Sequence, residues 1–327
     1  MMNMKEKQEY IDELLNSVVK KVLKEDKGKV IKSIIVTGSF GRGEPTFAVV
    51  DGKLRFKSDV EISLVYSHIK KKKMLDLMHK VESQFRETID LLPFQERRLV
   101  LAQNHNYALV EPRKKTLFTY DVFNGSYTLW GEDYLKRKIV KLNDVDKFEA
   151  KRIVANRIGE LVHNFNRDED MSKSEYTMIW KGKIVLAIVT AWLILYGQYE
   201  SSYHKQYEII KKDIDLVEAT LGQGFFWEYE KVFLFLRDAG EPFEVPDTHL
   251  RGYVKNINLL FKKEQLVKSE VNCLSKRIRS WFKYIKSGMH YGIRFENAIL
   301  QSLIDDYVFG SSHLKQSADT WSKVLYY

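Results

Sequence analysis

The spacing of apolar residues predicts a helix at the start of the chain, followed by a buried strand. From Tyr10 to Val22 apolar side chains recur every three or four positions, which is the period of a helix with one buried face. A short polar break follows. The run VIKSIIVTG, residues 30–38, is then typical of a strand buried on both faces and ending at a glycine.

A second strand is predicted by strict alternation in DVEISLVYS, residues 59–67. Successive side chains on a strand point to opposite faces. One face therefore carries Val60, Ile62 and Leu64, and the other carries Asp59, Glu61 and Ser63. Between the two strands, FAVVDGKLRF (47–56) is typical of a hairpin that turns at an Asp-Gly pair.

Further along, residues 70–92 are expected to form a helix, and residues 106–125 are expected to form two more strands. From about residue 145 onward the helical period dominates to the end. The pattern predicts an α+β protein with a mixed sheet in residues 1–140, followed by an all-helical domain in residues 141–327. The apolar stretch Ile184–Gly197 is shorter than the roughly 20 residues that cross a bilayer, so we expect a buried helix and no membrane partner.

Candidate chemistry gathers where the first strand ends. The segment TGSFGRGE (37–44) is almost bare of large side chains, so its backbone N–H groups can approach phosphate oxygens closely. Asp59 and Glu61 lie on one face of the second strand, where two carboxylates repel each other unless they are solvated or share a cation. Asp121, expected on a neighbouring strand, is a third acid within an apolar run. The alternative is that this segment forms an ordinary tight turn and that the nearby acids are simply solvated, without a phosphate or a cation.

These motifs, TGSFGRGE followed by SDVEISLV (58–65), resemble the Gly-Ser signature and paired-acid strand of the nucleotidyltransferase superfamily, which has the DNA polymerase β-like fold. The segment GSYTLWGEDYL (125–135) is similar to one found in antibiotic-modifying members. Ser39 and Asp59 are 20 residues apart, longer than is common in the family, and the predicted hairpin accounts for the excess.

The resemblance implies a transferase that moves a nucleoside monophosphate from an NTP such as ATP to a hydroxyl group and releases pyrophosphate. Asp59, Glu61 and Asp121 would hold Mg²⁺ or Mn²⁺, and Asp121 would alternatively accept the hydroxyl proton. Gly38 and Ser39 would hold phosphates and Arg42 would neutralise pyrophosphate. The acceptor implied is a small molecule such as an aminoglycoside-like antibiotic. Alternatives are an RNA or tRNA end, a protein side chain, a second nucleotide in a cyclic oligonucleotide, or an inactive relative that binds nucleic acid.

Several basic residues are further binding candidates. Lys181 and Lys183 precede the apolar stretch, where they would reach a triphosphate or simply be solvated, and Lys205 is a weaker candidate. Residues 251–294 mix lysine and arginine with aromatic residues, a composition that fits either nucleic-acid binding or the solvated face of an amphipathic helix.

The overall composition agrees with a polyanionic partner, since the net charge is +9 and the pI is about 9.2. The single cysteine, Cys273, excludes an internal disulfide and a cysteine-rich zinc site. The first residues are charged and lack the apolar core of a signal peptide, so we expect a cytoplasmic protein.

Overall fold

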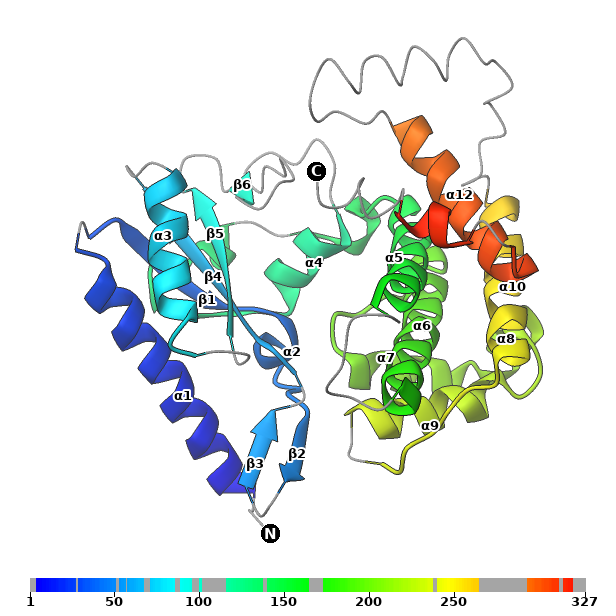
Figure 1. Cartoon of the computed structure of the whole chain (residues 1–327), viewed down its shortest axis with the longest axis horizontal. Helices are drawn as coiled ribbons and strands as arrows, with labels where there is room; N and C mark the ends of the chain where they lie inside the picture. The colour runs from blue at the N-terminus through cyan, green and yellow to red at the C-terminus, as the bar shows by residue number, and fades with distance from the viewer. Residues whose placement is uncertain are drawn as a thin grey trace. The chain divides into compact units, whose positions relative to one another are not determined.

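The computed structural model describes residues 4–27, 29–50, 53–56, 58–67, 71–85, 89–95, 100–101, 116–137, 140–164, 173–237, 240–264, 293–311 and 314–319. It divides into two compact units, Met1–Val145 and Asp146–Tyr327. The first contains the sheet and the second is helical, so the α+β fold class expected from the sequence is confirmed (Figure 1).

The first unit is built on a mixed five-stranded sheet with the strand order β6-β5-β4-β1-β7. Neighbouring strands are antiparallel except for β4 and β5, which are parallel. A separate two-stranded hairpin, β2–β3, pairs Phe47 with Phe56, as the sequence predicts. The strands are β1 (Ile31–Val36), β2 (Phe47–Val50), β3 (Lys53–Phe56), β4 (Val60–Tyr66), β5 (Ile89–Gln95), β6 (Val100–Leu101) and β7 (Tyr127–Gly131).

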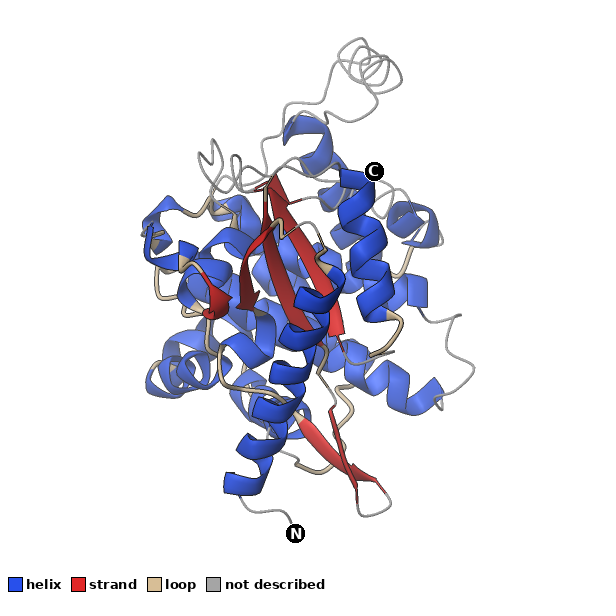
Figure 2. Cartoon of the chain, turned by 90° about the vertical axis from the view of Figure 1, so that its left-hand side faces the viewer, coloured by secondary structure: helices blue, strands red, loops and turns tan. Residues whose placement is uncertain are grey.

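One face of the sheet is covered by α1 (Met4–Glu25) and α3 (Lys71–Glu82), which lie on the same side of the sheet and contact each other (Figure 2). The apolar stripe of α1 meets Ile62 and Leu64 of β4, and these side chains are fully buried in one core. Ile62 and Leu64 therefore lie on the buried face of β4, as the alternating pattern predicts. Burial of such side chains stabilises the fold by about 1.5–3 kcal/mol each, which fixes the register of β4.

The opposite face of the sheet packs against α4 (Leu117–Asn124) and the short 3-10 helix η1 (Tyr134–Arg137). Ile35 and Val65 point to this side and contact Tyr134, with Phe118 and Phe123 of α4 packed around them. Because side chains alternate along β4, Glu61 lies on the same side as Val65. Glu61, the candidate acid of β4, thus lies on the α4 face.

Two elements differ from their predictions. Residues 117–124 form the helix α4 rather than a strand, because Thr116 caps its first turn by accepting a hydrogen bond from the Thr119 N–H, and Gly125 ends it. The helix expected over 70–92 ends at Glu82, and Ile89–Gln95 instead form β5 along β4. The other residues of the expected strand region, 106–115, lie outside the described part of the chain.

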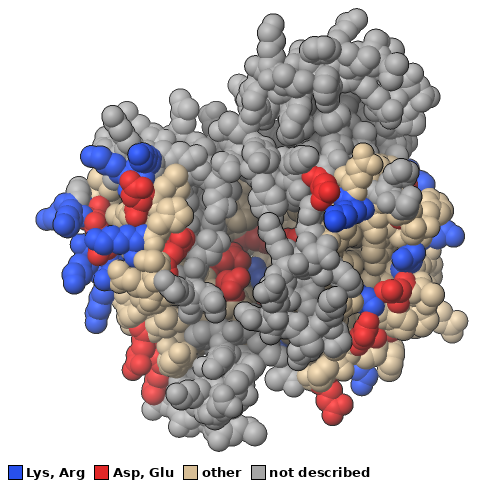
Figure 3. Space-filling model, viewed as in Figure 1, with Lys and Arg blue, Asp and Glu red and all other residues tan. Residues whose placement is uncertain are grey.

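Lysines gather on the solvent side of α1 and α3, with acids interspersed (Figure 3). Lys72, Lys73 and Lys80 are exposed, and the Lys80 ammonium lies 2.6 Å from the Glu25 carboxylate. The hydrogen bond from Lys80 lowers the pKa of Glu25. Part of the positive net charge is therefore an ordinary solvated helix surface.

The second unit is a helical bundle around α6. Thr177–Leu195 of α6 is long and apolar enough to cross a bilayer, but 78% of that window is buried within the protein, as expected for the core helix of a bundle. The helices are α5 (Phe148–Asn164), α6 (Lys173–Leu195), α7 (Tyr203–Lys212), α8 (Ile214–Leu221), α9 (Phe225–Arg237), α10 (Asp247–Lys263) and α12 (Ile293–Phe309).

A buried lysine lies among α5, α10 and α12. Lys151 of α5 is fully buried, and burial lowers its pKa from near 10.5 to about 8, with Lys262 acting in the same direction and Asp305 against it. The Asp305 carboxylate also accepts hydrogen bonds from Asn258 and Gln301. Between pH 8 and 10.5 the unfolded chain therefore binds this proton and the folded chain does not, so Lys151 makes stability rise with pH there.

We predict that this effect is visible in Lys151→Met. As the pH rises from 8 to 10.5, the free energy of unfolding of the parent should increase relative to that of the variant by up to about 3 kcal/mol. Urea unfolding at several pH values measures the difference. Lys255→Met, which changes an exposed lysine of α10, is the control and should show no such trend. A constant difference between parent and Lys151→Met would contradict the assignment.

Candidate functional site

The Gly-Ser segment forms a compact turn directly after β1. Thr37 ends the extended backbone, and Gly38–Gly41 form a single helical turn, α2. The turn closes through the Gly41 N–H to the Thr37 carbonyl at 3.0 Å and the Arg42 N–H to the Gly38 carbonyl at 3.1 Å. Thr37 occupies the N-cap position, but its side chain makes no capping hydrogen bond. The start of α2 is thus left without the usual side-chain acceptor.

Glu61 is held against this turn. The Thr37 N–H donates to the Glu61 carbonyl at 2.9 Å, and the Thr37 hydroxyl lies 3.3 Å from that carbonyl and 3.5 Å from the carboxylate. Gly38 has φ +62°, and a Cβ at this position would stand 2.7 Å from the carboxyl carbon of Glu61. Glycine is favoured here by its positive φ, and any Cβ would force the carboxylate end of Glu61 to move.

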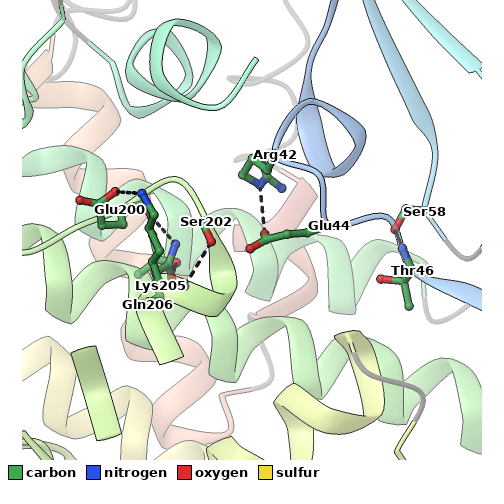
Figure 4. A network of polar contacts seen from close by, with 9 residues as sticks. Arg42, Glu44, Thr46, Ser58, Glu200, Ser202, Lys205 and Gln206 are labelled. Carbon is green, nitrogen blue, oxygen red and sulfur yellow. Dashed lines mark hydrogen bonds and ion pairs between the residues drawn. The ribbon is translucent and has the colours of Figure 1, made fainter. Parts of the chain in front are cut away.

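Asp59 lies at the entrance to β4, two residues before Glu61, and its side chain is exposed. The preceding residue, Ser58, accepts a hydrogen bond from the Thr46 N–H at 3.3 Å (Figure 4). This bond joins the two ends of the inserted β2–β3 hairpin. The hairpin therefore lengthens the chain between the turn and Asp59 while Glu61 stays beside the turn.

Asp121 needs correction, because it lies on helix α4 and not on a strand of the sheet. The last turn of α4 approaches the Gly-Ser turn: a Cβ on Gly41 would stand 2.6 Å from the Gly125 carbonyl, and the Gly125 N–H donates to the Asp121 carbonyl. Asp121 is partly exposed and shares the sheet face that carries Glu61.

The acid that a neighbouring strand offers is Asp90, which the sequence interpretation missed. Its backbone pairs with Glu61 in the parallel β4–β5 ladder. The helical pattern predicted through residue 92 extends over this acid. The apolar residues on both sides of Asp90, in Ile-Asp-Leu-Leu, are the signal that would have found it.

No group of three His, Cys, Asp or Glu side chains in the described part of the chain is placed to hold a metal ion. Asp59, Glu61 and Asp121 are therefore not assembled into a three-carboxylate centre. The side chain of Asp90 lies outside the described set. The structure brings together Gly38, Thr37 and Glu61.

Arg42 follows the turn and is paired with an acid two residues later. Its Nε lies 3.7 Å from Oε2 of Glu44, and the two side chains are only 12% and 7% exposed (Figure 4). The Glu44 N–H donates to the Ser39 carbonyl at 2.8 Å, which folds the segment back on itself. Ser39 is also buried.

The lysines singled out from the sequence lie in the helical unit. Lys181 is buried, with its ammonium 2.6 Å from Glu244 and 2.8 Å from Asp247. Burial lowers the pKa of Lys181, but the hydrogen bonds to Asp247 and Glu244 outweigh it and raise that pKa overall. Its positive charge is already compensated within the unit.

Lys183 and Lys205 have different surroundings. The Lys183 ammonium lies 3.9 Å from the centre of the Trp180 ring, a cation–π contact. Lys205 is exposed, its backbone N–H donates to the Ser202 hydroxyl that caps α7, and its ammonium lies 3.6 Å from Glu200 (Figure 4). A role of Lys181 or Lys183 in binding a triphosphate stays a prediction.

The basic tract 251–294 is described only at 251–264 and 293–294. In the first of these segments, the aromatic residues Tyr253 and Phe261 are buried in the core, while Lys255, Lys262 and Lys263 are exposed. The described part therefore has the basic solvent face and apolar inner face of an amphipathic helix. It presents no aromatic ring of the tract for stacking with bases.

No protein-family model matches the sequence, and no curated protein matches it significantly. Among solved structures, the chain is similar to the crystal structure of spectinomycin adenyltransferase AAD(9) from Enterococcus faecialis with ATP and spectinomycin. The identity is 15% and the TM-score 0.41, over 76% of this chain and 97% of the other. At this similarity we base the function on the residues of this chain.

The contact between Gly38 and Glu61 is testable with a matched pair of variants. Gly38→Ala and Gly43→Ala both place a side chain at positive φ, near +62° and +71°, so each should cost roughly 1–2 kcal/mol of stability. Only Gly38→Ala should displace Glu61, because a Cβ on Gly43 meets nothing within 4 Å.

Thermal unfolding measures the shared cost, and the ¹³C resonance of the Glu61 carboxyl carbon reports the displacement. We expect that resonance to shift in Gly38→Ala and to stay near the parent value in Gly43→Ala. Equal spectra for the two variants would mean that the carboxylate does not rest on Gly38.

Proposed function

We propose that the protein is a Mg²⁺-dependent nucleotidyltransferase that moves a nucleoside monophosphate from an NTP to a hydroxyl group and releases pyrophosphate. The observation that carries the proposal is the Glu61 carboxylate packed on Gly38, at the junction of β1 and the Gly-Ser turn. An acidic group and a backbone turn suited to phosphate are thus held side by side.

The turn supplies the phosphate-binding groups. The uncapped start of α2 presents the N–H groups of Gly38 and Ser39 for phosphate oxygens, and the Ser39 hydroxyl adds a further donor. We assign the β- and γ-phosphates to these groups. Arg42, the residue directly after the turn, neutralises the pyrophosphate as it leaves.

The residues present fit a magnesium ion. Mg²⁺ prefers carboxylate and phosphate oxygens and usually needs only one or two protein carboxylates when a nucleotide is bound. Glu61 on β4 and Asp59, directly before that strand, would provide two, and the backbone of Asp90 pairs with that of Glu61 in the ladder. When bound, the ion polarises the phosphate and stabilises the charge that develops on the leaving group.

The reaction that these groups serve is an in-line displacement at the α-phosphorus. The acceptor oxygen forms a bond to this phosphorus while the bond to the bridging β-phosphate oxygen breaks, and pyrophosphate leaves with that oxygen. The hydroxyl proton passes to a carboxylate. Asp121 and Asp90 are the two candidates for that base.

We favour a small-molecule acceptor, such as an aminoglycoside-like antibiotic, over a nucleic acid. In the described segment 251–264 the aromatic residues that would stack with bases are part of the core. The exposed lysines alone would supply only non-specific attraction to phosphates.

The test is release of pyrophosphate from each NTP in the presence of Mg²⁺ and a panel of hydroxyl acceptors, with labelled nucleotide traced into product. We predict that Asp59→Asn and Asp90→Asn each lower the rate at least roughly 100-fold, because the first removes a proposed metal ligand and the second removes an acid whose backbone pairs with Glu61. Asp121→Asn should do so only if Asp121 is the base.

Asp76→Asn, which changes an exposed acid of α3, is the control and should keep the parent rate. Thermal unfolding of every variant separates loss of chemistry from loss of fold. Full activity of Asp59→Asn would contradict the assignment of Asp59 as a metal ligand. Parent-like activity of Asp90→Asn would leave Asp121 as the third acid of the site.

A further inference from the structure

The hydroxyl group of Thr37 is buried against Glu61. Thr37 is only 2% exposed, so its hydroxyl is removed from bulk water and needs an acceptor within the protein. Within the described part of the chain, both oxygens that it reaches belong to Glu61: the backbone carbonyl at 3.3 Å and the carboxylate Oε2 at 3.5 Å. Thr37 occupies the N-cap position of α2 but makes no capping bond there. Its side chain is therefore directed at Glu61 and not at the turn.

The two distances describe one hydroxyl proton shared between two acceptors. Each is longer than the about 2.7–2.8 Å of a typical O–H···O bond, as expected when one donor serves two oxygens. The carboxylate is the stronger acceptor because it is charged. The carbonyl already accepts from the Thr37 N–H at 2.9 Å. The hydroxyl therefore gains most by donating to the carboxylate, with the carbonyl as a second acceptor in reach.

The residue after Thr37 confines the same carboxylate from another side. A Cβ on Gly38 would stand 2.7 Å from the carboxyl carbon of Glu61 and 2.8 and 2.9 Å from its two oxygens. A glutamate side chain has several rotatable bonds, and its terminal torsion is only loosely restricted unless contacts fix it. Two consecutive residues thus limit this group, because Gly38 leaves the space for it and Thr37 supplies a directional bond.

We propose that Thr37 is a positioning residue, whose hydroxyl holds the Glu61 carboxylate over Gly38 so that it is in place when Mg²⁺ and the NTP bind. The inference rests on the nucleotidyltransferase function proposed above and adds Thr37 to the residues that serve it. Mg²⁺ places strict demands on the geometry of its ligands, so a carboxylate that is already oriented binds the ion better. When the carboxylate turns to the ion, the hydroxyl keeps the carbonyl as its acceptor.

Thr37→Val tests the proposal, because valine keeps the shape of threonine and lacks the hydroxyl. We expect Thr37→Val to need about tenfold more Mg²⁺ for half-maximal release of pyrophosphate, since loss of a group that orients a metal ligand typically weakens a metal site by this factor or more. In the free protein, the ¹³C resonance of the Glu61 carboxyl carbon should shift as well. Thr37→Ser, which keeps the hydroxyl, should restore both parent values.

Thr190→Val is the matched control. Thr190 is also buried, and its hydroxyl donates to Gln206 at 3.2 Å within the helical unit. This variant should keep the Mg²⁺ dependence and the Glu61 resonance of the parent, and thermal unfolding shows whether each variant folds. A further measurement needs no variant and decides the matter should Thr37→Val fail to fold. In the parent, Mg²⁺ with a non-hydrolysable NTP should move the hydroxyl proton resonance of Thr37 and leave that of Thr190 in place.

A parent-like Mg²⁺ dependence of Thr37→Val overturns the proposal, as does failure of Thr37→Ser to restore it. A Glu61 resonance that ignores the loss of the hydroxyl, or a Thr37 hydroxyl resonance that Mg²⁺ and NTP do not move, has the same consequence. In all these cases a parent that transfers nucleotide keeps the proposed function. A parent that releases no pyrophosphate from any NTP overturns the proposed function, and the role of Thr37 falls with it.

Discussion

The contact between the Glu61 carboxylate and the Cα of Gly38 is the constraint on which the candidate site depends. It is fixed by backbone structure: β1 and β4 pair antiparallel, and the Thr37 N–H to Glu61 carbonyl bond extends that ladder by one residue beyond β1. A carboxylate placed by a sheet ladder keeps its position better than one placed by a loop. Any side chain at residue 38 would occupy the space of the carboxyl group.

The same strand serves folding and chemistry because its side chains alternate. Ile62 and Leu64 are buried against α1 and α3, and this burial sets the register. A slip of one residue would move Glu61 into that apolar core, where a charged group without a partner is costly. The hydrophobic core thereby keeps Glu61 on the face of the sheet that carries α4, beside the Gly-Ser turn.

Local patterns in the sequence were sufficient for β1, β4, the hairpin and the helical second unit, because each has a clear period or turn signal. They failed where contacts with a distant part of the chain determine the secondary structure. The segment TLFTYDVF is rich in residues that favour strands, yet the cap at Thr116 and packing of Phe118 and Phe123 on the sheet make it a helix. Residues 89–92 continue a helical pattern, yet they pair with β4.

In the candidate site, too, residues with a local sequence signal were predictable and those placed by long-range contacts were not. Gly38, Ser39, Asp59 and Glu61 stand out in the sequence, since glycines after a strand and alternating acids are local signals. The pairing of Asp90 with Glu61 depends on a parallel ladder between strands, which no local pattern specifies. The partners of Lys181 are equally distant, since Glu244 and Asp247 lie more than 60 residues further along the chain.

The contacts of Lys181 and Arg42 also indicate which of the two is the better candidate for binding phosphate. Lys181 has two short contacts, at 2.6 and 2.8 Å, and both carboxylates would have to give up a buried cation before it could bind another anion. Arg42 lies directly after the Gly-Ser turn, and its Nε is 3.7 Å from the Glu44 carboxylate, farther than either carboxylate is from the Lys181 ammonium. Arg42 is therefore the stronger candidate, because it follows the turn proposed to hold the phosphates, whereas recruiting Lys181 would break two short contacts.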